Sequence, residues 1–214
     1  QGDPSVAGVW EVPIPDGDVT LLTAGLEHDA LEPAVSPSGA FVAVELYDSE
    51  TNRSDIAVFD SNLDSWQVIT DEMPMFDYRS PRWEPSPDHG ERLVFMQYYE
   101  DGSDDVTQLC FATQADGETW SVVTADVEAQ LLEGRLISNP RWKPTGGELL
   151  LDYRITDNAA GLNVAGLVVY DVDADSAQLL TTDGEPELAH WSHDGNKILM
   201  WDRSVETNTD TSER

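Results

Sequence analysis

The residues best suited to chemistry in this sequence are its few basic side chains. Arg82, Arg141 and His190 each stand directly before a tryptophan, and Arg79 and Arg135 lie a short distance upstream of the first two. A guanidinium binds carboxylates and phosphates through two parallel hydrogen bonds, so basic residues that recur at one position could form a site for an anion. The alternative is that each arginine pairs with a nearby Asp or Glu and fixes a loop.

Carboxylates that alternate along the chain raise the question of a cation site. Asp171, Asp173 and Asp175 occur in "DVDADS", but the glycine and the distal glutamate of an EF-hand loop are missing. His190 and His193 could supply two metal ligands, whereas a catalytic metal site uses three or more protein ligands. We therefore expect no cofactor, and the acidic loops are interpreted as a solvated surface.

No catalytic motif stands out in the sequence. A nucleophile elbow, an HExxH helix and a phosphate-binding loop are all missing. Glycosidases use a pair of carboxylates, and among 42 acidic residues no pair can be singled out. Catalytic residues are therefore not assigned, and a protein that is not an enzyme is favoured.

The charge of the chain sets the conditions in which it can fold. Its 214 residues include 42 Asp and Glu against 11 Lys and Arg, for a net charge of −31. Such a charge repels itself in dilute buffer, and salt at about 1 M shortens the Debye length to roughly 3 Å. The composition predicts adaptation to high salt and disfavours nucleic acid and anionic membranes as partners. No apolar run approaches the ~18 residues of a membrane span, so membrane insertion is not expected.

The elements that must position the basic residues are repeated hairpins. Four stretches, here called the anchor hairpins, share an apolar anchor, a turn with a glycine and an apolar run; they cover 32–46, 80–98, 139–153 and 188–201. Their anchors are Val35, Trp83, Trp142 and Trp191. A proline stands two residues after the first three anchors, where a strand must end because proline has no N–H to donate. The tryptophan anchors are expected to fill the space between sheets.

A second type of hairpin alternates with the first. Each of these threonine hairpins has an apolar strand, a turn with Asp or Gly, and a strand that ends in Thr; they cover 9–23, 56–70, 109–124 and 167–181. The sequence therefore predicts an all-β protein. Cys110, the only cysteine, lies among strand residues and is expected to be an inert buried thiol.

The stretches "HWSHDGNKIL" and "PAVSPSGAFVA" resemble the PD40 or TolB-like β-propeller repeat, whose pattern is Pro-x-Trp-Ser-Pro-Asp-Gly before an apolar strand. The resemblance covers most of residues 8–201 and departs at Val35, Ala189 and His193. It implies a propeller of four-stranded antiparallel blades. It also implies that the loops before the anchors open at one end of the ring, where the basic residues would gather. Such repeats serve many functions.

The order of the hairpins predicts how the propeller closes. Residues 8–23 lack an anchor hairpin and residues 188–201 lack a threonine hairpin, so together they would make one complete sheet. We expect a single domain of residues 8–201, with four blades closed in this way, between tails at 1–7 and 202–214. A fragment of a larger ring and a half-ring that dimerises into eight blades are the alternatives.

The favoured function is a non-enzymatic binding or scaffold domain that holds a protein or a small anionic ligand at a loop face. The expected ligand-binding residues are Arg79, Arg82, Arg135, Arg141 and His190. The alternatives are a carbohydrate-active hydrolase or lyase that uses channel carboxylates or a His-bound metal, and a structural domain of a larger cell-envelope protein. Because the chain begins with Gln1, we expect that a leader or upstream protein was removed, and we expect a monomer outside the cytoplasm.

Overall fold

The computed structural model divides the chain into two compact units, Gln1–Asp126 and Val127–Arg214. It describes residues 7–14, 17–70, 76–86, 88, 90–101, 104–114, 119–125, 127, 135–157, 162–180 and 186–202. Residues 1–6 and 203–214, which make up nearly all of the two predicted tails, lie outside these ranges. Within the ranges, no helix has the length and apolar character that a membrane span requires.

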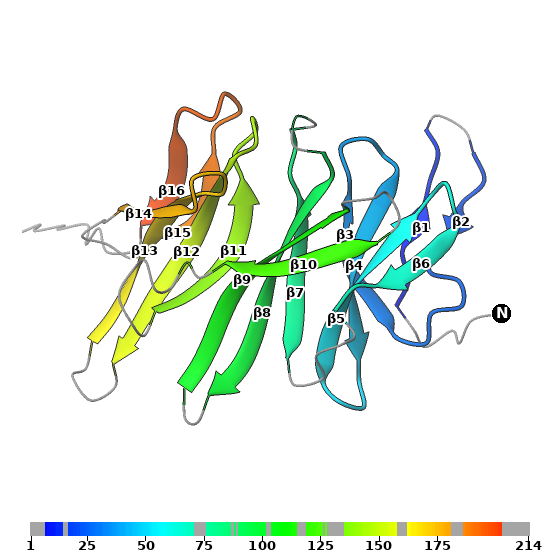
Figure 1. Ribbon diagram of the computed structural model, residues 1–214, viewed down its shortest axis with the longest axis horizontal. Helices are drawn as coiled ribbons and strands as arrows, with labels where there is room; N and C mark the ends of the chain where they lie inside the picture. Colours follow the sequence, from blue (N-terminus) through cyan, green and yellow to red (C-terminus); the bar gives the residue numbers. More distant parts are fainter. Residues whose placement is uncertain are drawn as a thin grey trace, which may run out of the picture. The chain divides into compact units, whose positions relative to one another are not determined.

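The first unit contains three antiparallel sheets (Figure 1). An N-terminal hairpin pairs β1 (Trp10–Glu11) with β2 (Thr20–Leu21). The first four-stranded sheet has its strands in chain order: β3 (Asp29–Val35), β4 (Phe41–Asp48), β5 (Arg53–Asp60) and β6 (Ser65–Val68). The second has the same order: β7 (Asp77–Trp83), β8 (Arg92–Asp101), β9 (Asp104–Gln114) and β10 (Trp120–Ala125).

The second unit contains one complete sheet and one hairpin. The four-stranded sheet again follows chain order: β11 (Arg135–Trp142), β12 (Glu148–Asp157), β13 (Leu162–Asp171) and β14 (Ser176–Leu180). The hairpin pairs β15 (Pro186–Trp191) with β16 (Ile198–Asp202). The prediction of an all-β protein with four-stranded antiparallel sheets is confirmed.

Both predicted types of hairpin form where the sequence placed them. In every anchor hairpin the first strand ends at the anchor. The next residue donates its N–H to the carbonyl of the first residue of the second strand, or, in the fourth hairpin, to the carbonyl of Lys197 directly before that strand. The turn between the strands contains a glycine with φ of 68–76°, a conformation that residues with a Cβ rarely adopt. These glycines are Gly39, Gly90, Gly146 and Gly195.

The sheet that was expected to close the ring is not among the described strand pairs. β1–β2 and β15–β16 are each a two-stranded sheet by themselves. Each therefore corresponds to half of a four-stranded blade, as the sequence predicted for 8–23 and 188–201. Closure of the ring and the number of blades stay predictions.

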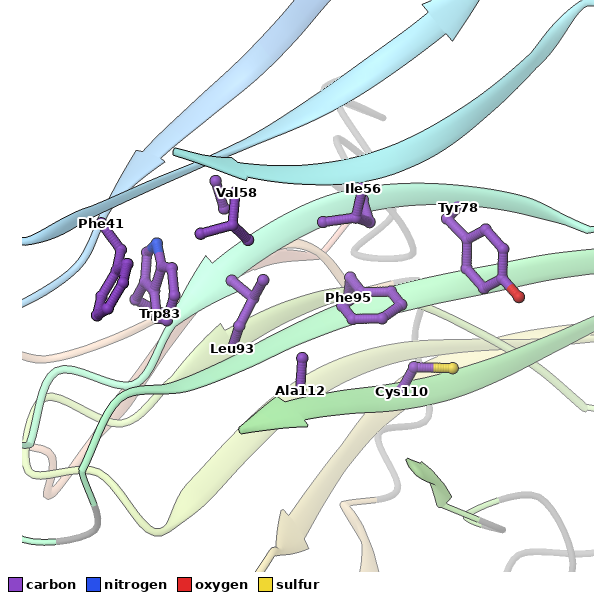
Figure 2. Packing of buried hydrophobic residues seen from close by; sticks show 10 residues of the cluster. Phe41, Ile56, Val58, Tyr78, Trp83, Leu93, Phe95, Cys110 and Ala112 are labelled. Atoms are coloured by element: carbon purple, nitrogen blue, oxygen red, sulfur yellow. The ribbon is translucent and has the colours of Figure 1, made fainter. Parts of the chain in front are cut away.

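The core of the first unit lies between its two four-stranded sheets (Figure 2). Phe41 of β4, Trp83 of β7 and Trp120 of β10 form a group with ring centroids 5.5–6.0 Å apart. The indole N–H of Trp83 donates to the carbonyl of Ala34 at 2.9 Å, so this anchor also bonds to the sheet on which it packs. Cys110 is buried in the same core, which confirms the prediction of a buried thiol.

The second unit repeats this anchor contact. Trp191 packs against a cluster of Leu150, Leu167 and Ala189, and its indole N–H donates to the carbonyl of Arg141 at 3.1 Å. The ammonium of Lys143 lies 5.6 Å from the centre of the Trp191 ring. The predicted packing of tryptophan anchors between sheets is confirmed for Trp83 and Trp191.

Candidate functional site

A β-bulge interrupts the first strand of every anchor hairpin, just before the anchor. The pairing register shifts at this point in β3, β7, β11 and β15. The bulged residue has a positive φ in three copies: Glu32 (46°), Ser80 (58°) and Asn139 (51°). A proline follows in each of these copies, and it is tolerated at a bulge because the sheet ladder is broken there. A bulge redirects the side chains beside it, and these include the predicted basic residues.

The registers of the hairpins show which residues are equivalent across the bulge. Arg82 and Arg141 occupy the place of Ala34 in the first copy and of His190 in the fourth. On the facing strand, Glu45 of β4 and Asp152 of β12 share one place. The repeat pattern in the sequence did not single out these two carboxylates. The available signal was a single acid inside an apolar run, "FVAVEL" and "ELLLDY", since an acid at a core position is uncommon.

In the second unit, Arg141 is held by Asp152. Both terminal nitrogens of the guanidinium donate to the carboxylate, at 2.9 and 2.8 Å, and the side chains are 19% and 22% exposed. The side-chain amide of Asn139, the bulged residue, donates to the same carboxylate at 2.9 Å. This two-point geometry fixes the direction of the guanidinium.

In the first unit, Arg82 bridges two sheets. Met96 stands where Asp152 stands in the other unit, so Arg82 has no acid opposite it on β8. It donates instead to Glu32 on β3 at 2.9 Å and to the carbonyl of Pro81 at 2.8 Å. The Arg82–Glu32 pair is more open to solvent, with the side chains 43% and 46% exposed.

Arg79 belongs to a second charged group beside this pair. Its guanidinium forms an ion pair with Asp77 and lies 5.5 Å from the centre of the Tyr98 ring. Asp77 accepts the backbone N–H of Ser54 on β5 at 2.9 Å. The hydroxyl of the same serine donates to Glu45 at 2.9 Å, so Ser54 links the two acids of neighbouring sheets.

Burial and neighbouring polar groups shift the pKa values of the residues in this charged group in opposite directions. Burial raises the pKa of Glu45 above its ordinary value, while hydrogen bonds from Ser54 and from the backbone N–H of Ser80 act against this shift. Burial is likewise the largest cause that raises the pKa of Tyr98, and the Arg79 charge lowers it. The pKa of Arg79 is raised chiefly by its hydrogen bond to Asp77. A carboxyl with a raised pKa is a property of general acids, but Glu45 is buried and accepts hydrogen bonds from two protein groups.

The five predicted ligand-binding residues are divided between the two units. Arg79 and Arg82 lie on β7 of the first unit, on either side of its bulge. Arg135, Arg141 and His190 belong to the second, where His190 is exposed on β15. Arg135 begins β11, and its side chain lies outside the described part of the structure. The structure thus divides these residues between two units, and a shared anion site stays a prediction.

The alternating aspartates form a turn. The carboxylate of Asp171 accepts the backbone N–H groups of Asp173 and Ala174, and Asp175 accepts the hydroxyl of Tyr170 at 2.6 Å. Within the described ranges, no three His, Cys, Asp or Glu residues are grouped so that they could hold a metal ion. The contacts give these aspartates a structural role in the turn.

An open hollow of about 510 Å³ lies beside the same turn in the second unit. Glu148, Asp171 and Asp173 contribute carboxylates to its lining, and Lys143 contributes an ammonium that is paired with Glu148 at 3.0 Å. The turn glycines Gly146 and Gly147 form another part of the wall. The hollow is polar and open, and three acids and one cation are among its lining residues.

Comparison with solved structures identifies the architecture. Hydrazine synthase from Kuenenia stuttgartiensis superposes with a TM-score of 0.63 at 13% identity, over 86% of this chain and 30% of that one. A putative TolB from Agrobacterium tumefaciens superposes with a TM-score of 0.56 at 16% identity, over 93% of this chain and 68% of that one. Oligogalacturonate lyase in complex with manganese superposes with a TM-score of 0.58 at 13% identity, over 83% of this chain and 48% of that one.

The fold is that of a β-propeller. At identities of 13–16%, these likenesses establish the fold, and each four-stranded sheet is a blade. This chain spans less than half of the length of the synthase and of the lyase. No protein-family model and no curated protein matches the sequence. The resemblance to TolB-like propellers that the repeats suggested is confirmed at the level of the fold.

Proposed function

We propose that this chain is a non-enzymatic propeller domain, adapted to high salt, that binds a small anionic ligand or an acidic group of a protein. Its ligand would contact the basic residues beside the bulges of the first strands. We further propose a location outside the cytoplasm and a soluble partner, since the acidic surface disfavours nucleic acid and anionic lipid.

The observation that supports this proposal is the repeated placement of a fixed guanidinium. Arg82 and Arg141 occupy the same bulge-adjacent position, and each is oriented by a carboxylate. In a chain with 42 acidic and 11 basic residues, few places can attract an anion. The more exposed Arg82 is the stronger candidate for contact with a ligand, because a ligand can approach it without breaking a buried pair.

The carboxylates at the same position are engaged in structural contacts. Glu45 accepts hydrogen bonds from Ser54 and Ser80, and Asp152 accepts hydrogen bonds from Arg141 and Asn139. A general base must be able to reach the proton that it removes. These acids face the protein's own donors, which favours a binding role over catalysis.

Titration with citrate and inorganic phosphate, at one fixed molar KCl concentration, tests the proposal. We expect the change Arg82→Gln to weaken binding about tenfold, equivalent to ~1.4 kcal/mol. The matched control is Arg53→Gln, which changes an exposed arginine at the start of β5, a strand without a register shift. Equal affinity in both variants, or failure of both anions to bind the unmodified chain, would contradict the proposal.

A second candidate function is a carbohydrate-active hydrolase or lyase. The observation in its favour is the hollow in the second unit, whose lining includes Glu148, Asp171 and Asp173 together with Lys143. Incubation with uronic-acid and neutral oligosaccharides, with and without Mn²⁺, tests this function. Product formation that disappears in Asp173→Asn would favour the enzyme, and no product under any condition would exclude these substrates.

A further inference from the structure

Two arginines of the second blade (β7–β10) stand on either side of the bulge in β7. Arg79 lies opposite Met96 of β8, and Arg82 lies opposite Val94. Met96 and Val94 are two residues apart, so they project from the same face of the sheet, and each arginine shares the face of the residue that it opposes. In a regular strand, residues three apart would project from opposite faces. The extra residue of the bulge therefore brings both arginines to one face.

The strand β7 differs in this respect from the other three bulged strands. In β3, β11 and β15 the position of Arg79 is held by an uncharged or an acidic residue, namely Leu31, Ser138 and Glu187. Among these four strands, β7 alone therefore has a basic residue on both sides of the bulge. Neighbouring side chains on one face of a strand start about 6.5 Å apart, so one elongated ligand can reach both guanidinium groups.

The facing strand of the second blade has no acid at the place where the third blade (β11–β14) has one. In the third blade, Asp152 of β12 binds both terminal nitrogens of Arg141. Met96 takes the place of Asp152 in the second blade, directly opposite Arg79. The third blade thus supplies its own carboxylate to the guanidinium beside the bulge, and in the second blade a carboxylate of a ligand can take this part.

The two arginines of β7 each have an acid partner within the first unit. Arg79 pairs with Asp77 and Arg82 with Glu32, and the two arginine side chains are 49% and 43% exposed. A guanidinium carries five N–H donors, and a carboxylate accepts two of them in a bidentate pair. A half-exposed arginine can therefore bind a ligand carboxylate and keep its acid partner. All four side chains belong to one unit, so the site is contained in it.

We propose that the second blade binds an elongated dianion, such as a dicarboxylate, with one acid group on Arg79 and the other on Arg82. This inference rests on the proposed binding of anions beside the bulges, and it narrows that function to one blade and to a ligand with two acid groups. Once the first acid group is bound, the second is held at a high effective concentration beside the other arginine. A ligand with a single acid group has no such gain.

Calorimetric titration with linear dicarboxylates of increasing length, from malonate to pimelate, tests this inference at pH 8 and one fixed molar KCl concentration. At this pH both acid groups of every ligand are ionised, so the ligands differ in the separation of their charges. We expect adipate and pimelate to bind at least fivefold more tightly than malonate, because only the longer chains can span about 6.5 Å. We expect Arg79→Gln to weaken pimelate binding at least fivefold and to abolish the preference for length.

The control is again Arg53→Gln, which should keep both the affinity and the preference for length. Binding that depends on Arg82 but neither on Arg79 nor on chain length would overturn this inference and leave the proposed anion site in place. Failure of every dicarboxylate to bind would overturn both. The unmodified chain decides the question even where Arg79→Gln does not fold, because equal affinity for malonate and pimelate would overturn the inference by itself.

Discussion

At the scale of single residues, the most deeply buried charge in the described structure is Glu84, directly after the Trp83 anchor. Its side chain is fully buried, and it accepts the Nε–H of Arg92 at 2.6 Å. Removal of one partner from a buried pair leaves an uncompensated charge and costs about 3–5 kcal/mol. We expect this loss of unfolding free energy for Arg92→Met, measured by denaturant unfolding in molar KCl.

Two control variants make this prediction specific. Arg53→Met removes an exposed arginine and should change stability by no more than about 0.5 kcal/mol. Glu84→Met combined with Arg92→Met removes both charges and should recover most of the loss. A stability loss in Arg92→Met that is no larger than that of the control would show that the pair contributes little.

Cys110 provides a pH-dependent prediction at the same scale. Burial raises the pKa of this thiol to about 11, so that almost none of it is thiolate at pH 8 in the folded protein. We expect negligible reaction with a disulfide reagent at pH 8 and complete reaction after denaturation. Fast labelling of the folded chain at that pH would contradict the described packing of the second blade.

The residue types in the sequence predicted the positions of the basic residues but did not show which acids pair with them. The basic residues before the anchors were visible because charge is scarce and repeats align them. The carboxylates that pair with these arginines could not be identified in the sequence. Glu32 contacts Arg82 from a neighbouring sheet, and Asp152 contacts Arg141 across a bulge. A bulge changes the register by one residue, so the strand pattern in the sequence does not show which side chains meet there.

At the scale of elements, the bulge in the first strand is the feature that orients the site. Ser80 adopts φ of 58°, which costs a residue with a Cβ about 1–2 kcal/mol and a β-branched residue more. We expect Ser80→Val to destabilise the chain by about 2 kcal/mol and Ser80→Gly to be tolerated, measured by denaturant unfolding. Equal stability of the two variants would show that the positive φ is not required.

The hairpins themselves were largely predictable from the sequence. Glycine marked each anchor turn because φ there is positive, and proline marked the end of the first strand because it has no N–H. The pairing of β1–β2 with β15–β16 was expected from their complementary types; each forms a two-stranded hairpin among the described strand pairs, and closure of the ring stays a prediction. Hairpin sequences encode their own turns, whereas contacts between distant hairpins depend on surfaces that the local pattern does not specify.

At the scale of the whole molecule, we expect the net charge of −31 to determine how stability depends on salt. In dilute buffer this charge repels itself, and about 1 M salt screens repulsion beyond roughly 3 Å. We expect the melting temperature to rise by tens of degrees between dilute buffer and molar KCl, as followed by circular dichroism. A melting temperature that is independent of salt would remove the proposed adaptation to high salt.

The central claim is that the bulge-adjacent arginines bind an anion in addition to holding the fold. The most direct test is the double variant Arg82→Gln/Arg141→Gln, titrated with citrate and melted at the same molar KCl concentration. Because both pairs are partly exposed, we expect a loss of only about 1–2 kcal/mol in stability, between the values for surface and buried pairs. We expect citrate affinity to fall by at least tenfold. A loss of stability with unchanged citrate affinity would contradict the claim and leave these arginines a purely structural role.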